Sequence, residues 1–129
     1  MENKLVHART FKGLEVYKQA RSLVKSIFDL TKDFPVEEKY SLTDQIRRYS
    51  RAIEAQIAES WGKRRYEKYF VLKLTDSDAE QYETQHWLEV AFENTNILKK
   101  TKDDFISQCE SIEKMLNSMI NKSSKFCKN

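Results

Sequence analysis

The sequence predicts an all-α protein: an antiparallel, up-and-down four-helix bundle with one long third helix. The 129 residues contain only 2 Gly and 1 Pro, whereas sheets, barrels and sandwiches need more of both for their turns. Hydrophobic residues make up 40% and charged residues 33%, which is typical of helices that bury one face and expose the other. Apolar residues also recur at helical spacing in four separate stretches.

The first predicted helix begins near Leu14 and ends before Pro35. Proline lacks a backbone N–H and disfavours helical geometry at the preceding residue, so Asp33 and Phe34 should leave the helix. Its predicted buried face consists of Leu14, Tyr17, Ala20, Val24, Ile27 and Thr31.

The second predicted helix has Ser41 and Asp44 at its start, in the pattern of an N-cap. Gly62 is expected to end it as a left-handed cap. The predicted buried face consists of Leu42, Ile46, Tyr49, Ile53, Ile57 and Ser60.

The third predicted helix runs from about Tyr66 to Phe92 and would span roughly 40 Å at 1.5 Å per residue. Its four-three spacing indicates a coiled-coil-like seam with a polar middle. The seam residues are Phe70, Leu74, Ser77, Gln81, Thr84, Leu88 and Ala91. With Gln45 and Gln56, the polar members Ser77, Gln81 and Thr84 are expected to form a buried hydrogen-bonded layer that fixes register or lines a subunit contact.

A fourth helix is predicted after Asn94, Thr95 and Asn96, which break the pattern, with Thr101 and Asp104 as its cap. Its face consists of Phe105, Cys109, Ile112, Leu116 and Met119. Residues 1–129 should form one domain, with about ten N-terminal residues and about eight C-terminal residues, the polar tail from Lys122, expected to be flexible.

The N-terminal residues do not resemble a signal peptide, and no stretch has the roughly 18 apolar residues of a membrane helix, so we expect a cytoplasmic protein without membrane contact. Cys109 and Cys127 lack Cys-x-x-Cys spacing and are expected to be free thiols.

The basic residues are the most suggestive functional feature. Arg47 and Arg51 share a helix face with Arg48 beside them, and a second group follows Gly62, with Tyr66 and Tyr69 as possible stacking platforms. The candidate nucleic-acid-binding residues are Arg47, Arg48, Arg51, Lys63, Arg64, Arg65 and Lys68. Alternatively, these side chains offset a helix dipole or form ion pairs within an assembly.

Charge is segregated along the chain. Residues 43–75 hold eight basic and four acidic residues, whereas residues 76–93 hold six acidic residues and no Lys or Arg. These regions could pair within one bundle or between neighbouring copies in a head-to-tail ring. Trp61, Trp87 and Phe92 lie off the main seams and are the candidate oligomer-interface residues.

Catalysis is the least favoured reading. Asp76, Glu80 and Glu83 could hold magnesium for a nucleotide hydrolase, but a second acidic motif on a facing helix is missing from the pattern. Glu83-x-x-His86 is half of a di-iron motif that must occur twice. We therefore expect no enzyme, no cofactor and no metal site.

Three motifs occur in order along the chain: Phe34-Pro35-x-x-Glu38-x-Tyr40-x-Leu42-x-x-Gln45-Ile46-Arg47-Arg48, then Ile53-x-x-Gln56-Ile57-Ala58-Glu59-x-x-Gly62, then Ser77-Asp78-Ala79-Glu80 leading to Glu83-Thr84-Gln85 and Trp87-Leu88. From about Phe11 to Ile120 the chain resembles the four-helix-bundle proteins encoded in bacterial 23S rRNA intervening sequences. It departs from them at Glu54, where the family has a small residue or proline, at Gln56, where it has Asn, and at Ser60, where it has Gly.

The resemblance implies an up-and-down bundle that assembles into a homopentameric ring. Relatives of the family include the accessory variability protein of diversity-generating retroelements, which binds nucleic acid and a reverse transcriptase through a basic surface. The leading hypothesis is therefore a noncatalytic homo-oligomer that binds RNA or DNA. The alternatives are a structural or protein-interaction bundle and, third, a magnesium-dependent nucleotide hydrolase.

Overall fold

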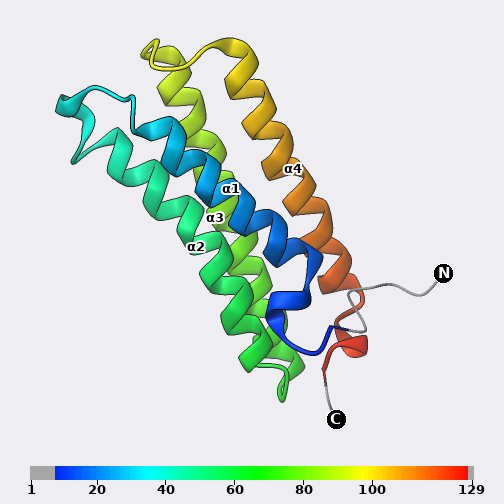
Figure 1. Cartoon of the computed structure of the whole chain (residues 1–129). Coiled ribbons are helices and arrows are strands. Elements are labelled where there is room, and N and C mark those ends of the chain that lie inside the picture. The colour runs from blue at the N-terminus through cyan, green and yellow to red at the C-terminus, as the bar shows by residue number, and fades with distance from the viewer. Residues whose placement is uncertain (1–7, 128–129) are drawn as a thin grey trace.

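The computed structural model describes residues 8–127 and shows four helices in the described part, with no strand. They are α1 (Glu15–Thr31), α2 (Leu42–Gly62), α3 (Glu67–Glu93) and α4 (Lys99–Asn121). The helices run alternately up and down, and contacts join α1 to α2, α2 to α3, α3 to α4 and α4 back to α1 (Figure 1). The predicted all-α bundle with a long third helix is confirmed. None of the helices described combines the length and apolar character needed to cross a bilayer.

The third-helix seam was predicted without error. Its seven residues are all buried, because α3 packs against both α2 and α4 along its length. On α1 the buried face is turned slightly from the predicted one: Val16 and Leu23 are buried, whereas Tyr17 and Val24 are only half-buried. Three-four spacing fits either set of residues, and the positions of the neighbouring helices decide between them.

In each of the two remaining helices, one residue predicted to be buried is only half-buried. On α2, Ser50 is buried and Tyr49 is half-buried, and on α4, Phe105 is half-buried. The other predicted members of both stripes are buried.

Buried polar side chains on α3 form hydrogen bonds in the core. Ser77 donates from Oγ to the carbonyl oxygen of Ile53 on α2 at 2.8 Å. Gln81 donates to Asp78 at 3.0 Å and accepts from Gln85 at 2.7 Å. Ser77 therefore links two helices through a buried polar contact.

The two glutamines of α2 that were expected in this buried polar layer are not part of it. Gln45 and Gln56 are half-buried, so they lie at the margin of the core rather than in a buried layer. Gln56 accepts a 3.4 Å hydrogen bond from Lys73.

The predicted cap residues do not cap the helices. Ser41 stands at the N-cap of α2, but its hydroxyl donates to the Glu38 carboxylate at 2.7 Å and accepts no hydrogen bond from the first N–H groups of the helix. Gly62 is the last residue of α2 and has no positive φ. Thr101 lies inside α4, whose N-cap is Leu98.

The C-terminus of α3 ends in a Schellman motif. The N–H of Asn96 donates to Ala91 and that of Thr95 donates to Phe92, both at 2.9 Å. A Schellman motif requires a left-handed backbone conformation at the residue after the C-cap. Thr95 follows the C-cap residue Asn94 and has this conformation, with φ of 59°.

The chain that follows α4 packs back onto the bundle. A short 3-10 helix, η4 (Ser123–Lys125), leads to Phe126, which is buried and stacks on Phe70 with ring centroids 5.8 Å apart. The tail was expected to be flexible, yet Phe126 is part of the core, and only residues 128–129 of that segment lie outside the described residues.

The N-terminal segment is also partly packed. The 3-10 helix η2 (Phe11–Gly13) precedes α1, and Phe11 meets Tyr17 edge to face at 5.0 Å. The flexibility predicted for about the first ten residues falls mainly on residues 1–7, which lie outside the described residues.

Candidate nucleic-acid interface

The predicted basic residues separate into two groups at opposite ends of α2. Arg47, Arg48 and Arg51 lie in its first half, whereas the second group lies where α2 meets α3. At 1.5 Å per residue, Arg51 and Lys63 are about 18 Å apart along the helix axis. We refer to the second group, Lys63, Arg64, Arg65 and Lys68, as the junction cluster.

Arg47 is held in a fixed position between α1 and α2. Its Nε donates to Thr31 Oγ1 at 2.7 Å, and its guanidinium carbon lies 4.5 Å from the Phe28 ring centroid. The Thr31 hydroxyl donates in turn to the Ile27 carbonyl at 2.8 Å. The guanidinium is thus preorganised, and less rotamer entropy is lost when it binds a ligand.

A surface groove surrounds Arg47 at the beginning of α2, and we call it the α1–α2 groove. It is lined by Lys39, Tyr40, Thr43, Asp44, Arg47, Arg48 and Arg51. Four of these side chains are cationic and one is anionic. The Oγ1 atom of Thr43 is buried and has no hydrogen-bond partner among the described residues.

The junction cluster is built differently. Arg64 donates from Nε to the Trp61 carbonyl oxygen at 2.9 Å, and its guanidinium carbon lies 3.6 Å from the Trp61 ring centroid. The other three cations of the cluster are exposed. Tyr66 and Tyr69 are exposed beside them and meet edge to face at 5.9 Å.

None of the predicted basic residues forms an ion pair with a carboxylate among residues 8–127. Within residues 8–127, the ion pairs formed by Lys and Arg involve Arg21, Lys32, Lys73, Lys99, Lys100 and Lys102. None of the seven predicted binding residues is among them. Their charges therefore remain available to an external anion.

Carboxylates gather on α3. Desolvation raises the pKa of Glu80, and the charges of Glu83 and Asp76 raise it further. Desolvation also raises the pKa of Asp78, with Gln81 opposing and Glu113 adding to the shift. No group of three His, Cys, Asp or Glu side chains that could hold a metal ion occurs in the described part of the chain.

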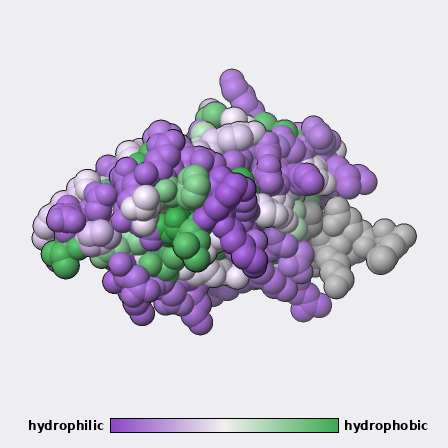
Figure 2. All heavy atoms as spheres, turned by 90° about the horizontal axis from the view of Figure 1, so that it is seen from above, coloured by the Kyte–Doolittle hydropathy of each residue, from purple (hydrophilic) through white to green (hydrophobic). Residues whose placement is uncertain are grey.

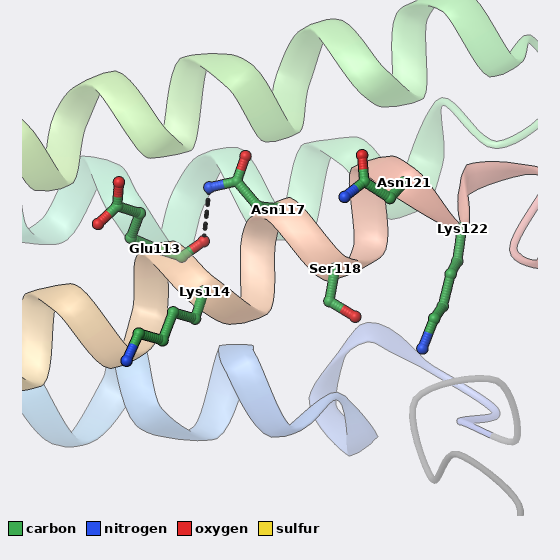
Figure 3. Close-up of a pocket in the computed structure, with 6 residues that line it drawn as sticks. All are labelled: Glu113, Lys114, Asn117, Ser118, Asn121 and Lys122. Atoms are coloured by element: carbon green, nitrogen blue, oxygen red, sulfur yellow. Dashed lines mark hydrogen bonds between the residues drawn. The ribbon is translucent and has the colours of Figure 1, made fainter.

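A shallow pocket along α4 is lined by polar and charged residues. It is lined by Glu113, Lys114, Asn117, Ser118, Asn121 and Lys122. Figure 3 shows Lys114 and Lys122 on the side of α4 opposite to Glu113. Tyr82 donates a hydrogen bond from α3 to Glu113, which raises the pKa of Tyr82 to about 12. Glu113 thus serves to join α3 to α4.

The predicted interface aromatics are half-buried in the monomer. Arg64 covers Trp61, Lys102 Nζ lies 4.9 Å from the Phe92 centroid, and His86 meets Trp87 edge to face at 4.8 Å. The Nε1 atom of Trp87 is buried without a hydrogen-bond partner in the described part.

Other apolar side chains are more exposed than these aromatics, and the sequence pattern did not single them out. Val36 is 88% exposed, Leu98 is 76% exposed and Leu72 is 50% exposed. Val36 lies in the connection between α1 and α2, and Leu98 lies in the connection between α3 and α4. Figure 2, which views the molecule from above, shows hydrophobic side chains gathered among hydrophilic ones. Only their position in the fold shows that these residues remain uncovered.

The model of the 23S rRNA-intervening sequence protein family matches residues 12–118. The chain belongs to this family. Among solved structures it is similar to a protein of unknown function from the S23 ribosomal protein family of Bacteroides thetaiotaomicron, with 25% identity and a TM-score of 0.74 over 82% of this chain and 95% of that chain. No curated protein matches the chain.

In this member of the 23S rRNA-intervening sequence protein family, the three residues of α2 that depart from the family pattern all form hydrogen bonds. Glu54 accepts two 3.1 Å hydrogen bonds from Arg21 on α1. Gln56 pairs with Lys73, and Ser60 is buried with its hydroxyl donating to Ile57 at 2.6 Å. These residues connect α2 to its neighbours or satisfy the helix backbone.

Proposed function

We propose that this protein is a noncatalytic, homo-oligomeric bundle, pentameric as the family resemblance implies, that binds RNA or DNA through its basic surface. Arg47 carries the proposal. It is half-buried and fixed by Thr31 and Phe28, yet no carboxylate pairs with it among residues 8–127. Buried or half-buried charges normally have a partner, and the planar fork of N–H donors of an arginine suits two oxygens of a phosphate.

The oligomeric part of the proposal is supported by side chains on α3 outside its buried seam. Tyr69, Leu72 and Tyr82 are 49%, 50% and 51% exposed. Exposed apolar groups on a helix that already buries another face are typical of a surface that contacts a partner. A second copy of the chain is the partner that the family resemblance implies.

A structural bundle without a nucleic-acid role is the second candidate, and the α3 carboxylates favour it. Asp78 and Glu80 have raised pKa values because they are desolvated and close to other carboxylates. Cations from a second copy would stabilise their ionised forms. In that case the arginines of the α1–α2 groove would lie in a head-to-tail contact and not on nucleic acid.

A salt titration separates the two candidates. If several cations contact phosphates, affinity for a generic oligonucleotide should fall on the order of 10³-fold between about 50 and 200 mM salt. Arg48→Glu, an exposed change in the α1–α2 groove, should weaken binding, while the charge-matched Lys114→Glu on α4 should not. Absence of binding at the low salt concentration rejects nucleic-acid binding, and equal losses from both variants reject the assigned surface.

The noncatalytic part is tested by incubating the protein with nucleoside triphosphates and magnesium. We expect no turnover above the buffer control. Hydrolysis that disappears on Glu80→Gln or Glu83→Gln would instead favour the nucleotide hydrolase.

A further inference from the structure

We propose that the α1–α2 groove selects unpaired nucleotides: its arginines hold a backbone phosphate while Tyr40 stacks on the neighbouring base. The inference rests on the proposed nucleic-acid binding and adds to it the strandedness of the ligand and the residue that reads it. Two halves of the groove carry the argument, one cationic and one aromatic.

The cationic half presents a fixed guanidinium. Because Nε of Arg47 is used by Thr31 and the ring of Phe28 lies against the guanidinium, its terminal nitrogens are left to donate to a ligand. Arg51 lies 5.9 Å from the same ring centroid, and Arg48 lines the same groove. Asp44 offsets one of the four positive charges, so the groove remains cationic and suits a phosphate.

The aromatic half is Tyr40, which is 85% exposed. It lies in the connection between the 3-10 helix η3 (Val36–Glu38) and α2, beside Lys39, whose Nζ is 5.3 Å from the ring centroid. No other aromatic ring stacks on Tyr40 in the described part of the chain. Tyr40 does not contribute to the buried core, and its exposed ring can stack on a ligand.

Stacking on an exposed ring distinguishes strands that are unpaired from strands that are paired. In a duplex the faces of each base are covered by neighbouring base pairs, whereas a single strand can turn a base onto an aromatic side chain. Cations alone would bind both forms. A phosphate groove with one open tyrosine at its edge therefore predicts a preference for single strands.

The test measures binding of the full chain to labelled oligo(U), oligo(dT) and a duplex of equal length by fluorescence anisotropy. Wild type should bind at least one single strand more tightly than the duplex. Tyr40→Ala should weaken single-strand binding about tenfold, because stacking on one base is worth about 1–3 kcal/mol. Duplex binding should not change, and Tyr40→Phe, which keeps the ring, should bind like wild type.

Leu98→Ala is the control, since Leu98 is an exposed apolar residue between α3 and α4 outside both basic groups, and it should leave both affinities unchanged. If Tyr40→Ala affects single strand and duplex equally, or neither, single-strand selection is wrong while the proposed function stands. If wild type binds none of the three ligands, the proposed function fails and the inference with it. A preference between oligo(U) and oligo(dT) shows whether the ribose is also contacted.

Discussion

Glu80 lies on α3 among other carboxylates, and its pKa is raised by desolvation and by the charges of Glu83 and Asp76. The folded protein therefore binds a proton at Glu80 more tightly than the unfolded chain does. Its ionisation lowers the free energy of unfolding as pH rises through the folded-state pKa, and this penalty is absent below the unfolded-state pKa.

Replacing Glu80 by Gln should therefore stabilise the protein at pH 7. Because Glu80 is partly solvated, the gain in unfolding free energy should stay below about 0.5 kcal/mol. It should shrink as pH falls through the raised pKa of Glu80 and vanish below about 4, where the carboxyl is protonated in both the folded and the unfolded state. Urea unfolding at both pH values measures this, with Glu110→Gln on the exposed side of α4 as control. A gain that is equal at both pH values would contradict the electrostatic cause.

Sequence identified the basic residues but not their geometry. Arg47 could be recognised from its spacing to Arg51, yet its fixed orientation depends on Thr31 and Phe28, which lie on another helix. Likewise, Trp61 and Phe92 read as unpartnered aromatics in sequence, whereas Arg64 and Lys102 cover them in the fold. The orientation and the burial of these side chains depend on contacts between segments that are far apart in the sequence. The spacing of residues along one helix gives no information about such contacts.

At the scale of elements, periodicity predicted the α3 seam fully because this helix packs against two neighbours along its length. The ends of helices were predicted less well. A hydroxyl or glycine at a plausible position is only one way to satisfy terminal backbone groups, and here Ser41 and Gly62 do not act as caps.

The Schellman motif after α3 predicts a stabilising substitution. Thr95 is a β-branched residue at φ 59°, a conformation that glycine adopts without steric cost. Thr95→Gly should raise the free energy of unfolding by about 1 kcal/mol. Asn94→Gly, one residue earlier at φ −85°, should give no gain. Thermal unfolding of both variants tests this prediction. A lower melting temperature for Thr95→Gly than for the wild type would contradict it.

The packed tail predicts a loss of stability outside the four helices. Phe126 is 6% exposed and stacks on Phe70, so Phe126→Ala should cost about 3 kcal/mol. Lys125→Ala, an exposed neighbour, should change little. Urea denaturation measures both. An unchanged midpoint for Phe126→Ala would mean that the tail does not contribute to the folded core.

At the scale of the whole molecule, basic and acidic side chains lie on different elements of one chain, and several apolar side chains are exposed to solvent. Val36 and Leu98 are exposed at one end of the bundle, and Leu72 is exposed on α3. The sequence singled out Trp61, Trp87 and Phe92 for a contact between copies. These three side chains are half-buried, whereas other apolar side chains are more exposed. Which apolar residues remain uncovered depends on how all four helices fit together.

Light scattering at micromolar concentration should give a mass several times the 15.4 kDa of one chain, and five times for a pentamer. Leu72→Lys on α3 should reduce that mass, because a charge in a contact between copies is desolvated. Leu98→Lys at the end of the bundle is the comparison. A wild-type mass of one chain would contradict the proposed assembly.

Because the C-terminal tail packs on the bundle, its Cys127 is a suitable position for a fluorescent label. Cys127 is half-buried beside the junction cluster. Desolvation and the charge of Glu67 raise the pKa of its thiol, and Arg64 opposes the shift. Cys109 is buried and its pKa is raised to about 12, so thiol reagents should modify Cys127 first. A dye placed there would respond to a ligand on the junction cluster and much less to one at Tyr40, because the two lie at opposite ends of α2. One labelled cysteine could thus report which end of the molecule is occupied.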